Sequence, residues 1–472
     1  MSYDTNHLVH ALCAHTAPDS VFIGGDKPMT YASFFEGAEQ MAAALKIAPG
    51  DRVAMQVGKS VEALQLYLAT VMAGGIFLPL NPAYTDAELR YFLEDATPVV
   101  FVQEPEKHRN WMVRTATTLS ELAEKASAGF TPVSRSGEDL AAILYTSGTT
   151  GRSKGAMLSH KALASNARVL KDYWQFTQDD VLIHALPVFH THGLFVATNV
   201  ALMAGASLEF LPKFDAKQIL EAMPRATTLM GVPTFYTRLL KESGLESASK
   251  NMRLFISGSA PLLEQTHKAW EARTGHVILE RYGMTETNMN TSNPYNGKRK
   301  AGTVGLPLPG VDLRIDAPQG EIGGIEVRGE NVFSGYWNMP EKTAEELRPD
   351  GWFITGDLGQ LDEEGYVTIV GRNKDLIISG GFNIYPKEVE EVIDRLDGVT
   401  ESAVVGVPDD DLGEKVVAVI VASKSLNAKE ILEDISQHLA RYKCPREVIF
   451  VEELPRNTMG KVQKNELRAR YS

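Results

Sequence analysis

Ile-Leu-Tyr-Thr-Ser-Gly-Thr-Thr-Gly-Arg-Ser-Lys-Gly, residues 143–155, joins an apolar segment to a polar loop. The apolar run over residues 140–144 predicts a buried strand, after which hydroxyl side chains, glycines and one lysine follow. Glycines let a backbone turn tightly and bring its N–H groups to an anion, while hydroxyls and a lysine add donors and charge. We therefore predict a phosphate-binding loop formed by Thr146, Ser147, Gly148, Thr149, Thr150, Gly151 and Lys154.

This loop differs from the nucleoside-triphosphate P-loop, because Ser153 before Lys154 breaks the spacing that a P-loop requires. The alternative is a polar hairpin tip, since clusters of Ser, Thr and Gly often mark only a loop. Further motifs along the chain favour the phosphate interpretation. They are Tyr282-Gly-Met-Thr-Glu286, Thr355-Gly-Asp357, Gly371-Arg-Asn-Lys-Asp-Leu-Ile377 and Pro455-Arg-Asn-Thr-Met-Gly-Lys461.

Together these motifs resemble those of the adenylate-forming superfamily, which includes acyl-CoA synthetases, peptide-synthetase adenylation domains and luciferases. The resemblance covers nearly the whole chain, and Arg281 directs it to the malonyl-CoA synthetases, which use malonate or methylmalonate. It implies ligation of a carboxylic acid to coenzyme A, with ATP and Mg²⁺, through an acyl-adenylate. The products would be the acyl-CoA, AMP and pyrophosphate.

The composition favours a soluble cytoplasmic enzyme. At 472 residues the chain exceeds what one hydrophobic core usually serves, and its two cysteines suit neither a disulfide framework nor a metal site. We expect no secretory signal, and no apolar run approaches the ~20 residues of a membrane-spanning helix. A net charge of −13 argues against nucleic acid as a partner.

Alternating apolar patterns predict an α/β architecture with stacked, largely parallel sheets. The expected strands cover residues 51–57, 76–80, 99–102, 140–145, 181–186 and 252–256. The last hundred residues predict a small α+β module, with helices carrying Val389, Val392, Ile393 and Leu396, and Ile431, Leu432, Ile435 and Leu439. Strands are expected over residues 402–407 and 416–421. We place the domain boundary between residues 372 and 373, so that residues 1–372 form the adenylation domain and 373–472 a mobile C-terminal domain.

The resemblance assigns roles at the nucleotide. Glu286 would hold Mg²⁺ against the phosphates and Thr285 would contact the α-phosphate. Asp357 would accept the ribose hydroxyls, with Arg372 at ribose or phosphate; the alternatives are a capping aspartate and a surface arginine. Lys461, on a tip expected to be exposed and flexible, would stabilise the charge that develops during adenylation. Its exposure also makes it a candidate for acetylation by a lysine acetyltransferase.

The acyl group would lie against the segment Pro187-Val-Phe-His-Thr-His-Gly193, where a packing or gating role for His190 is favoured over that of a catalytic base. The loop carrying Ser257 and Ser259 would face adenine and substrate, and Glu280 and Tyr282 would lie near adenine. Relatives that use fatty or aromatic acids usually carry a small residue where this chain has Arg281. A structural pair between Arg281 and Glu280 or another acid is the alternative.

Between the two half-reactions the small domain would rotate about a hinge at Lys374, which otherwise would be an ordinary exposed lysine. Rotation would remove Lys461 and bring the loop Gly380-Gly381-Phe382 to the pantetheine path, with Lys443 and its basic neighbours Arg441 and Arg446 near CoA phosphates. Those three could equally form a solvated basic cluster. The alternative functions are a short-chain monocarboxylate–CoA synthetase and a carrier-free adenylation enzyme. A peptide-synthetase module and a silent binding protein are disfavoured.

Overall fold

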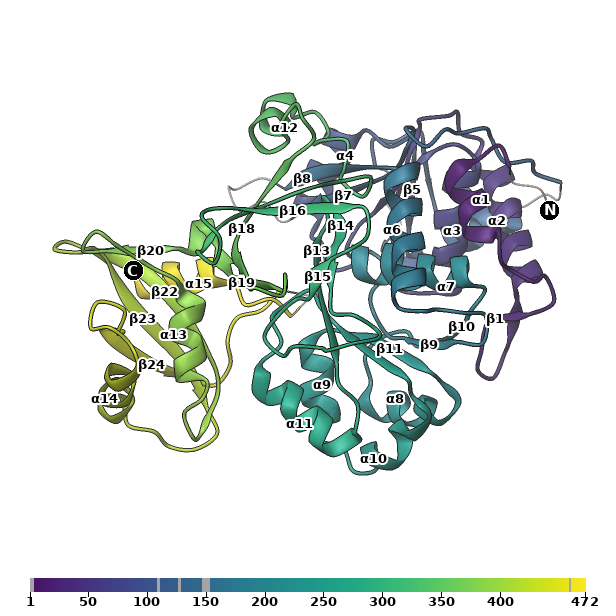
Figure 1. Ribbon diagram of the computed structural model, residues 1–472. Coiled ribbons are helices and arrows are strands. Elements are labelled where there is room, and N and C mark those ends of the chain that lie inside the picture. Colours follow the sequence, from purple (N-terminus) through teal and green to yellow (C-terminus); the bar gives the residue numbers. More distant parts are fainter. Residues whose placement is uncertain (1–3, 108–110, 126–128, 147–152, 458–459) are drawn as a thin grey trace.

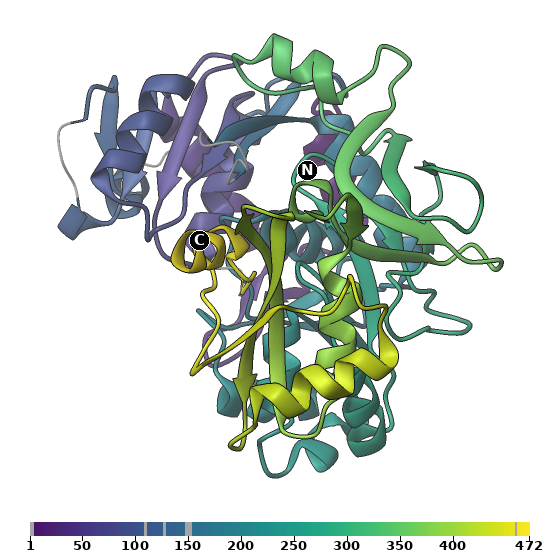
Figure 2. The same ribbon diagram turned by 90° about the vertical axis from the view of Figure 1, so that its left-hand side faces the viewer.

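The computed structural model describes residues 4–107, 111–125, 129–146, 153–457 and 460–472 (Figure 1). Two sheets with parallel centres build the larger part of the molecule, and two antiparallel-rich sheets follow along the chain. Figure 1 shows the C-terminal elements as a separate lobe on the left, and Figure 2 views the molecule with these elements in front. None of the described helices is both long and apolar enough to cross a membrane.

The largest sheet is parallel in its centre and antiparallel at both ends. In spatial order its strands are β15 (Leu306–Pro307), β14 (Asn288–Ser292), β13 (Leu279–Met284), β12 (Leu254–Ser257), β11 (Thr228–Gly231), β9 (Val181–His184), β10 (Ser207–Phe210), β1 (Val21–Ile23) and β2 (Met29–Thr30).

The second sheet is parallel except for the pair that flanks the glycine-rich loop. Its order is β6 (Thr115–Thr117), β5 (Val100–Gln103), β3 (Arg52–Gln56), β4 (Ile76–Pro79), β7 (Leu140–Thr146) and β8 (Lys154–Ser159).

One hydrophobic core joins both sheets to the helices that pack against them. Those helices include α1 (His7–Cys13), α2 (Tyr31–Leu45), α3 (Val61–Met72), α6 (His160–Tyr173) and α7 (Asn199–Ala204). Side chains cap several of them; Ser60 Oγ, for example, accepts from Ala63 N and opens α3. Other helices are α4 (Asp86–Ala96), α5 (Leu119–Glu124), α8 (Ala216–Ala222), α9 (Pro233–Leu239), α10 (Leu245–Ala248), α11 (Glu264–Thr274) and α12 (Pro340–Glu346), with 3₁₀ turns η1 (Pro105–Lys107), η3 (Met223–Arg225) and η4 (Ser249–Asn251).

An antiparallel sheet then leads to the small C-terminal sheet. The first contains β16 (Val311–Asp316), β17 (Gly323–Gly329), β18 (Phe353–Leu361) and β19 (Val367–Arg372), and the 3₁₀ turn η5 (Asn373–Asp375) follows it. The second has the order β21 (Phe382–Ile384), β20 (Ile377–Ser379), β23 (Gly413–Ala422), β22 (Val399–Asp409), with β24 (Glu447–Val451) beside β23. Its helices are α13 (Pro386–Ile393), α14 (Ala428–His438) and α15 (Lys464–Tyr471).

The predicted α/β class with mostly parallel sheets and a small α+β module is confirmed. Each strand expected in the large domain is present, with ends displaced by at most two residues. Two details were wrong: Leu396 and Leu439 lie beyond the ends of α13 and α14, although both still pack against the small core. Apolar spacing continues past a helix end because the following turn also covers the core. The chain leaves one sheet after Arg372 and enters the next at Ile377. The domain boundary between residues 372 and 373 stays a prediction.

Candidate active site

The loop that ends in Lys461 extends from the C-terminal lobe to the large domain. A Cβ built on Gly460 would lie 3.7 Å from Thr234 Oγ1, near the start of α9. Burial, followed by the charge of Arg372, lowers the pKa of Lys461 to about 8, while Asp357 and Glu286 raise it. Lys461 is therefore brought together with three predicted nucleotide contacts. The expectation of an exposed tip was wrong, since Lys461 is half-buried in this arrangement.

Asp357 is fixed from two sides at the edge of the β18–β19 ladder. Arg372 Nε lies 3.0 Å from Asp357 Oδ1, because β18 and β19 pair these two residues directly. Tyr282 OH donates to Asp357 Oδ2 at 2.5 Å from β13. The carboxylate raises the pKa of Arg372, and burial followed by that same carboxylate raises the pKa of Tyr282. Asp357 thus presents an oriented carboxylate, as a ribose contact requires.

A second group of charges lies at the base of the glycine-rich loop. Lys154 Nζ lies 3.1 Å from both carboxylate oxygens of Glu346 and 3.0 Å from Tyr336 OH. Tyr336 OH in turn lies 2.5 Å from Glu346 Oε2 and 3.0 Å from Glu286 Oε1. Burial raises the pKa of Glu286. Lys154 and Glu286 are therefore linked through Tyr336.

The polar loop itself is only partly described. Thr146 closes β7 and Lys154 opens β8, and the two residues pair across the ladder. Ser147, Gly148, Thr149, Thr150 and Gly151 lie outside the described residues. Thr285 is half-buried in the turn between β13 and β14, one residue before Glu286.

Arg281 occupies a different environment, because it is a buried cation without an acidic partner among the described residues. It is 3% exposed, and its Nε and Nη2 atoms have no hydrogen-bond partner there. The lack of a side chain at Gly258 makes room for the guanidinium, since a Cβ at that position would lie 2.4 Å from Arg281 Cζ. Burial lowers the pKa of Arg281 to about 9. The predicted alternative, a pair with Glu280, is wrong: Glu280 Oε1 lies 3.1 Å from His267 Nδ1 instead.

Further unpartnered polar atoms accompany this guanidinium. Ser257 Oγ and His192 Nε2 are buried without a partner among the described residues. His192 Nδ1 lies 3.3 Å from Ser259 Oγ, and Ser259 adopts a left-handed backbone with φ of 71°. A serine rarely takes that conformation, and such strain is concentrated at functional loops. Arg281, Ser257, Ser259 and His192 thus form a polar cluster in which several buried atoms have no hydrogen-bond partner among the described residues.

His190 lies close enough to both Lys461 and Arg281 for their charges to act on its ring. Burial and the charges of Lys461 and Arg281 lower the pKa of His190 to about 3, so the ring is neutral. His192 N donates to His190 Nδ1 at 3.3 Å, which leaves the proton on Nε2. A neutral ring flanked by cations is a poor base, which agrees with the gating role expected for it.

Other predicted residues lie apart from these groups. The Glu280 carboxylate is engaged in the core by His267. Gly380 and Gly381, with φ of 57° and 80°, form the turn between β20 and β21 in the C-terminal lobe (Figure 1). Lys443 Nζ pairs with Glu388 Oε1 at 2.5 Å. Lys374 is exposed within η5. Phe382 is exposed and stacks on Tyr442, with ring centroids 4.6 Å apart.

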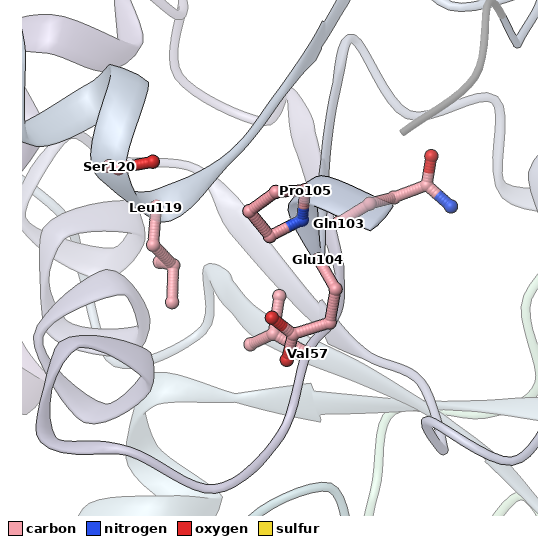
Figure 3. A pocket seen from close by; sticks show the side chains of 6 residues that line it. All are labelled: Val57, Gln103, Glu104, Pro105, Leu119 and Ser120. Carbon is pink, nitrogen blue, oxygen red and sulfur yellow. The ribbon is translucent and has the colours of Figure 1, made fainter. Parts of the chain in front are cut away.

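A cavity of about 210 Å³ lies away from these residues, at the carboxyl ends of β3 and β5 (Figure 3). Its lining residues are Val57, Gln103, Glu104, Pro105, Leu119 and Ser120. None of the predicted site residues lines it. Within it Glu104 Oε1 accepts from Gly58 N at 2.5 Å, so the only carboxylate of the lining is already bonded to backbone.

Comparison with known proteins fits this geometry. Residues 11–337 match the AMP-binding enzyme family, and residues 388–461 match the AMP-binding enzyme C-terminal domain. The chain belongs to this family. It is 36% identical over 482 residues to the malonate–CoA ligase of Arabidopsis thaliana, covering 89% of this chain and 78% of that protein.

Two other relatives widen the comparison. The indoleacetate–CoA ligase of Aromatoleum aromaticum is also 36% identical, over 94% of this chain and 93% of that protein. The crystal structure of ATP-bound MatB from Rhodopseudomonas palustris is 54% identical, with a TM-score of 0.95 over 99% of each chain. The predicted adenylate-forming family and the class of AMP-forming acid–CoA ligases are confirmed.

Proposed function

We propose that this enzyme ligates malonate to coenzyme A through malonyl-AMP, with methylmalonate as a second substrate. The observation that carries the choice of acid is the buried, unpaired guanidinium of Arg281. Burying a charge without a partner costs several kcal/mol. A dicarboxylate activated at one end supplies the missing anion with its other end, and a guanidinium matches a carboxylate in a two-pronged geometry. The Arabidopsis relative is named for the same acid.

The adenylation step joins an anionic carboxylate to an anionic phosphate, so alignment and charge neutralisation must supply most of the catalysis. We assign Lys461 to the charge that develops at the α-phosphate, Arg372 and Asp357 to the nucleotide, and Tyr282 to the adenine side. Thr285 and the loop from Thr146 to Lys154 would contact the phosphates. Glu286 fits a Mg²⁺ ligand because its buried carboxylate lies beside the Tyr336 phenol and near the charges of Lys154 and Arg372, with no ion pair among the described residues. Mg²⁺ would offset phosphate charge there.

Thioester formation needs a different arrangement of the small domain. Lys461 lies near Arg372, Asp357 and Glu286, to which we assign the nucleotide and Mg²⁺. The turn at Gly380 and Gly381, also in the C-terminal lobe, makes no hydrogen bond with these residues within the part of the chain that the structure describes. We infer that rotation about Lys374 exchanges the two. Lys443 and Glu388 would move together in that rotation, so a CoA phosphate would have to compete with Glu388 for Lys443.

Two further assignments belong to this proposal. We place the enzyme in the cytoplasm, on its composition. We also propose acetylation of Lys461 by a lysine acetyltransferase as a switch, since its lowered pKa leaves more neutral amine for reaction. Because Lys461 is half-buried here, modification would require the rotated arrangement. Full activity of a stoichiometrically Lys461-acetylated sample would exclude the switch.

Pyrophosphate release across a panel of acids tests the function. The panel contains malonate, methylmalonate, propionate and butyrate, each with and without CoA. We expect the highest kcat/KM with malonate, and malonyl-CoA as product when CoA is present. A preference for butyrate or propionate would indicate a short-chain monocarboxylate–CoA synthetase. Malonyl-AMP formation without thioester would indicate a carrier-free adenylation enzyme.

A further inference from the structure

A lysine outside the predicted site is bonded beneath the segment that carries His190 and His192. Lys59 follows β3, and its Nζ contacts three acceptors: His184 O at 2.5 Å, Leu211 O at 2.6 Å and His184 Nδ1 at 2.9 Å. The ammonium also lies 4.3 Å from the centre of the Phe210 ring. All three protons of the ammonium are thereby used. Lys59 joins the sheet of β3 to the sheet of β9 and β10.

His184 links Lys59 to η2 through its second ring nitrogen. With Lys59 as the donor to Nδ1, the ring proton lies on Nε2, where Gly193 O can accept it. Nε2 lies 2.9 Å from Gly193 O and 3.2 Å from Thr198 Oγ1. Burial and the charge of Lys59 lower the pKa of His184, which keeps the ring neutral. The polar chain therefore runs in one direction, from Lys59 through His184 to the carbonyl of Gly193.

That carbonyl belongs to an unusual helix. Residues His192–Thr198 (η2) form a π-helix, a geometry that is rare and is frequently found at functional sites. Thr198 Oγ1 also donates to Gly193 O, at 3.0 Å. Gly193 is packed so tightly that a Cβ there would lie 2.0 Å from Pro187 O. The first turn of η2 is thus fixed from two sides, directly beside His192 and its unpartnered Nε2.

We propose that Lys59 and His184 are positioning residues that hold the first turn of η2, and with it His192, in the wall of the acyl pocket. The proposal rests on the proposed function only in treating that pocket as the acyl site. Lys59 is half-buried, and its ammonium makes three bonds that an apolar side chain of similar size could not make. Two of these bonds go to His184, which ends β9 and is itself bonded to η2. The third goes to Leu211, the residue after β10.

The test separates positioning from simple stability. Lys59→Met removes the donors at similar size, and His184→Phe removes the donor to Gly193. In His184→Gln the amide nitrogen can take the place of Nε2–H. We expect Lys59→Met and His184→Phe to raise KM for the acid roughly tenfold, the scale of a lost charge-assisted hydrogen bond, with KM for ATP within about twofold of wild type. His184→Gln should restore most of the acid KM. Lys217→Met, on the exposed face of α8, is the matched control.

All variants are assayed with whichever acid the wild type uses best, so a failure of malonate leaves this test intact. Unchanged acid KM in both Lys59→Met and His184→Phe would overturn the proposal. So would equal losses for acid and ATP, or equal effects of His184→Gln and His184→Phe, since each would indicate a general packing role. If Lys59→Met does not fold, the His184 pair decides alone.

Discussion

The nucleotide side and the acyl side of the site treat their charges in opposite ways. On the nucleotide side Lys154 pairs with Glu346, Arg372 with Asp357, and Tyr336 bridges Glu346 and Glu286. On the acyl side Arg281 and its neighbours Ser257 and His192 keep unpartnered polar atoms, as far as the described residues show. Charges that orient one another hold a geometry before a ligand arrives. A buried charge without a partner favours binding of a ligand of opposite charge, because the ligand then supplies the missing ion pair.

This difference separates what is general in the family from what is particular to this chain. ATP is the same for every relative, so a prearranged network suits all of them. The acid differs between relatives, including a malonate ligase and an indoleacetate ligase at equal identity to this chain. Specificity can therefore reside in one unpaired group, which is where the largest mutational effect is expected.

Arg281→Gly breaks the acyl side. The distal carboxylate of malonate would lose its only cation, which costs about 3–5 kcal/mol, or on the order of 100-fold or more in kcat/KM. Activity with butyrate should change little or improve. Because the guanidinium is unpaired without ligand, the thermal midpoint should stay the same or rise. Arg281→Lys, which keeps the charge but not the fork, should fall between. A folded Arg281→Gly enzyme that still prefers malonate to butyrate would contradict the assignment.

Lys461→Ala breaks the nucleotide side. Losing one well-placed contact to transition-state charge costs on the order of 100–1000-fold, so malonyl-AMP formation should fall by that factor. Conversion of supplied malonyl-AMP and CoA to thioester should persist, because Lys461 is assigned to adenylation alone. The exposed Lys429→Ala in α14 serves as control. Equal loss of both half-reactions in a folded variant would show that Lys461 acts otherwise.

These two residues also show how far sequence reasoning reaches. The fold followed from apolar periodicity, and Lys461, Glu286, Asp357 and Arg372 followed from motifs; the structure brings those four together. Sequence could not show whether Arg281 has a partner, because Glu280 beside it is bonded instead to His267 on α11. Pairing across elements is decided by tertiary packing, which no local pattern encodes.

The residues that were missed share one property. Tyr336, Glu346, Lys59 and His184 contact predicted or proposed site residues or their backbone, and none stands in a motif of its own. Lys59 resembles any lysine after a strand until the carbonyls of His184 and Leu211 are seen around its ammonium. His192 was within a quoted segment, and its single distinguishing signal was its place two residues after His190.

Lys374→Pro tests whether the C-terminal lobe, which carries Lys461 to the nucleotide side, must rotate about this residue. A proline locks φ at one residue of the turn through which the lobe would rotate. We expect one half-reaction to fall at least about tenfold more than the other, measured with ATP plus malonate and with malonyl-AMP plus CoA. Lys374→Ala, which keeps the backbone free, should retain both. Equal retention by the proline variant would make Lys374 an ordinary surface residue.

The pH dependence tests whether Lys461 must be charged. With a pKa lowered to about 8, Lys461 becomes neutral as pH rises through that value and loses its attraction for phosphate. The kcat/KM for ATP, which reports the free enzyme, should therefore fall about tenfold per pH unit above that point. In kcat the same limb should lie at higher pH, since bound phosphates favour the charged form. Lys461→Arg should lose the limb. A flat profile up to pH 10 would contradict this.

Glu346→Gln tests the ion pair that Lys154 makes with Glu346 in the absence of nucleotide, for which we expect the smallest effect. If phosphates must displace Glu346 from Lys154, removing that carboxylate's charge should lower KM for ATP roughly two- to fivefold, the scale of a partly exposed ion pair. The acid KM should not change, because no bond links Glu346 to the acyl pocket among the described residues. Glu345→Gln, whose carboxylate pairs only with Lys342 there, is the matched control. A rise in KM for ATP would mean instead that Glu346 orients Lys154 for the phosphates. The ion pairs of the nucleotide side would then orient its cations for ATP rather than compete with ATP for them. The contrast with Arg281, which awaits its partner from the acid, would be stronger still.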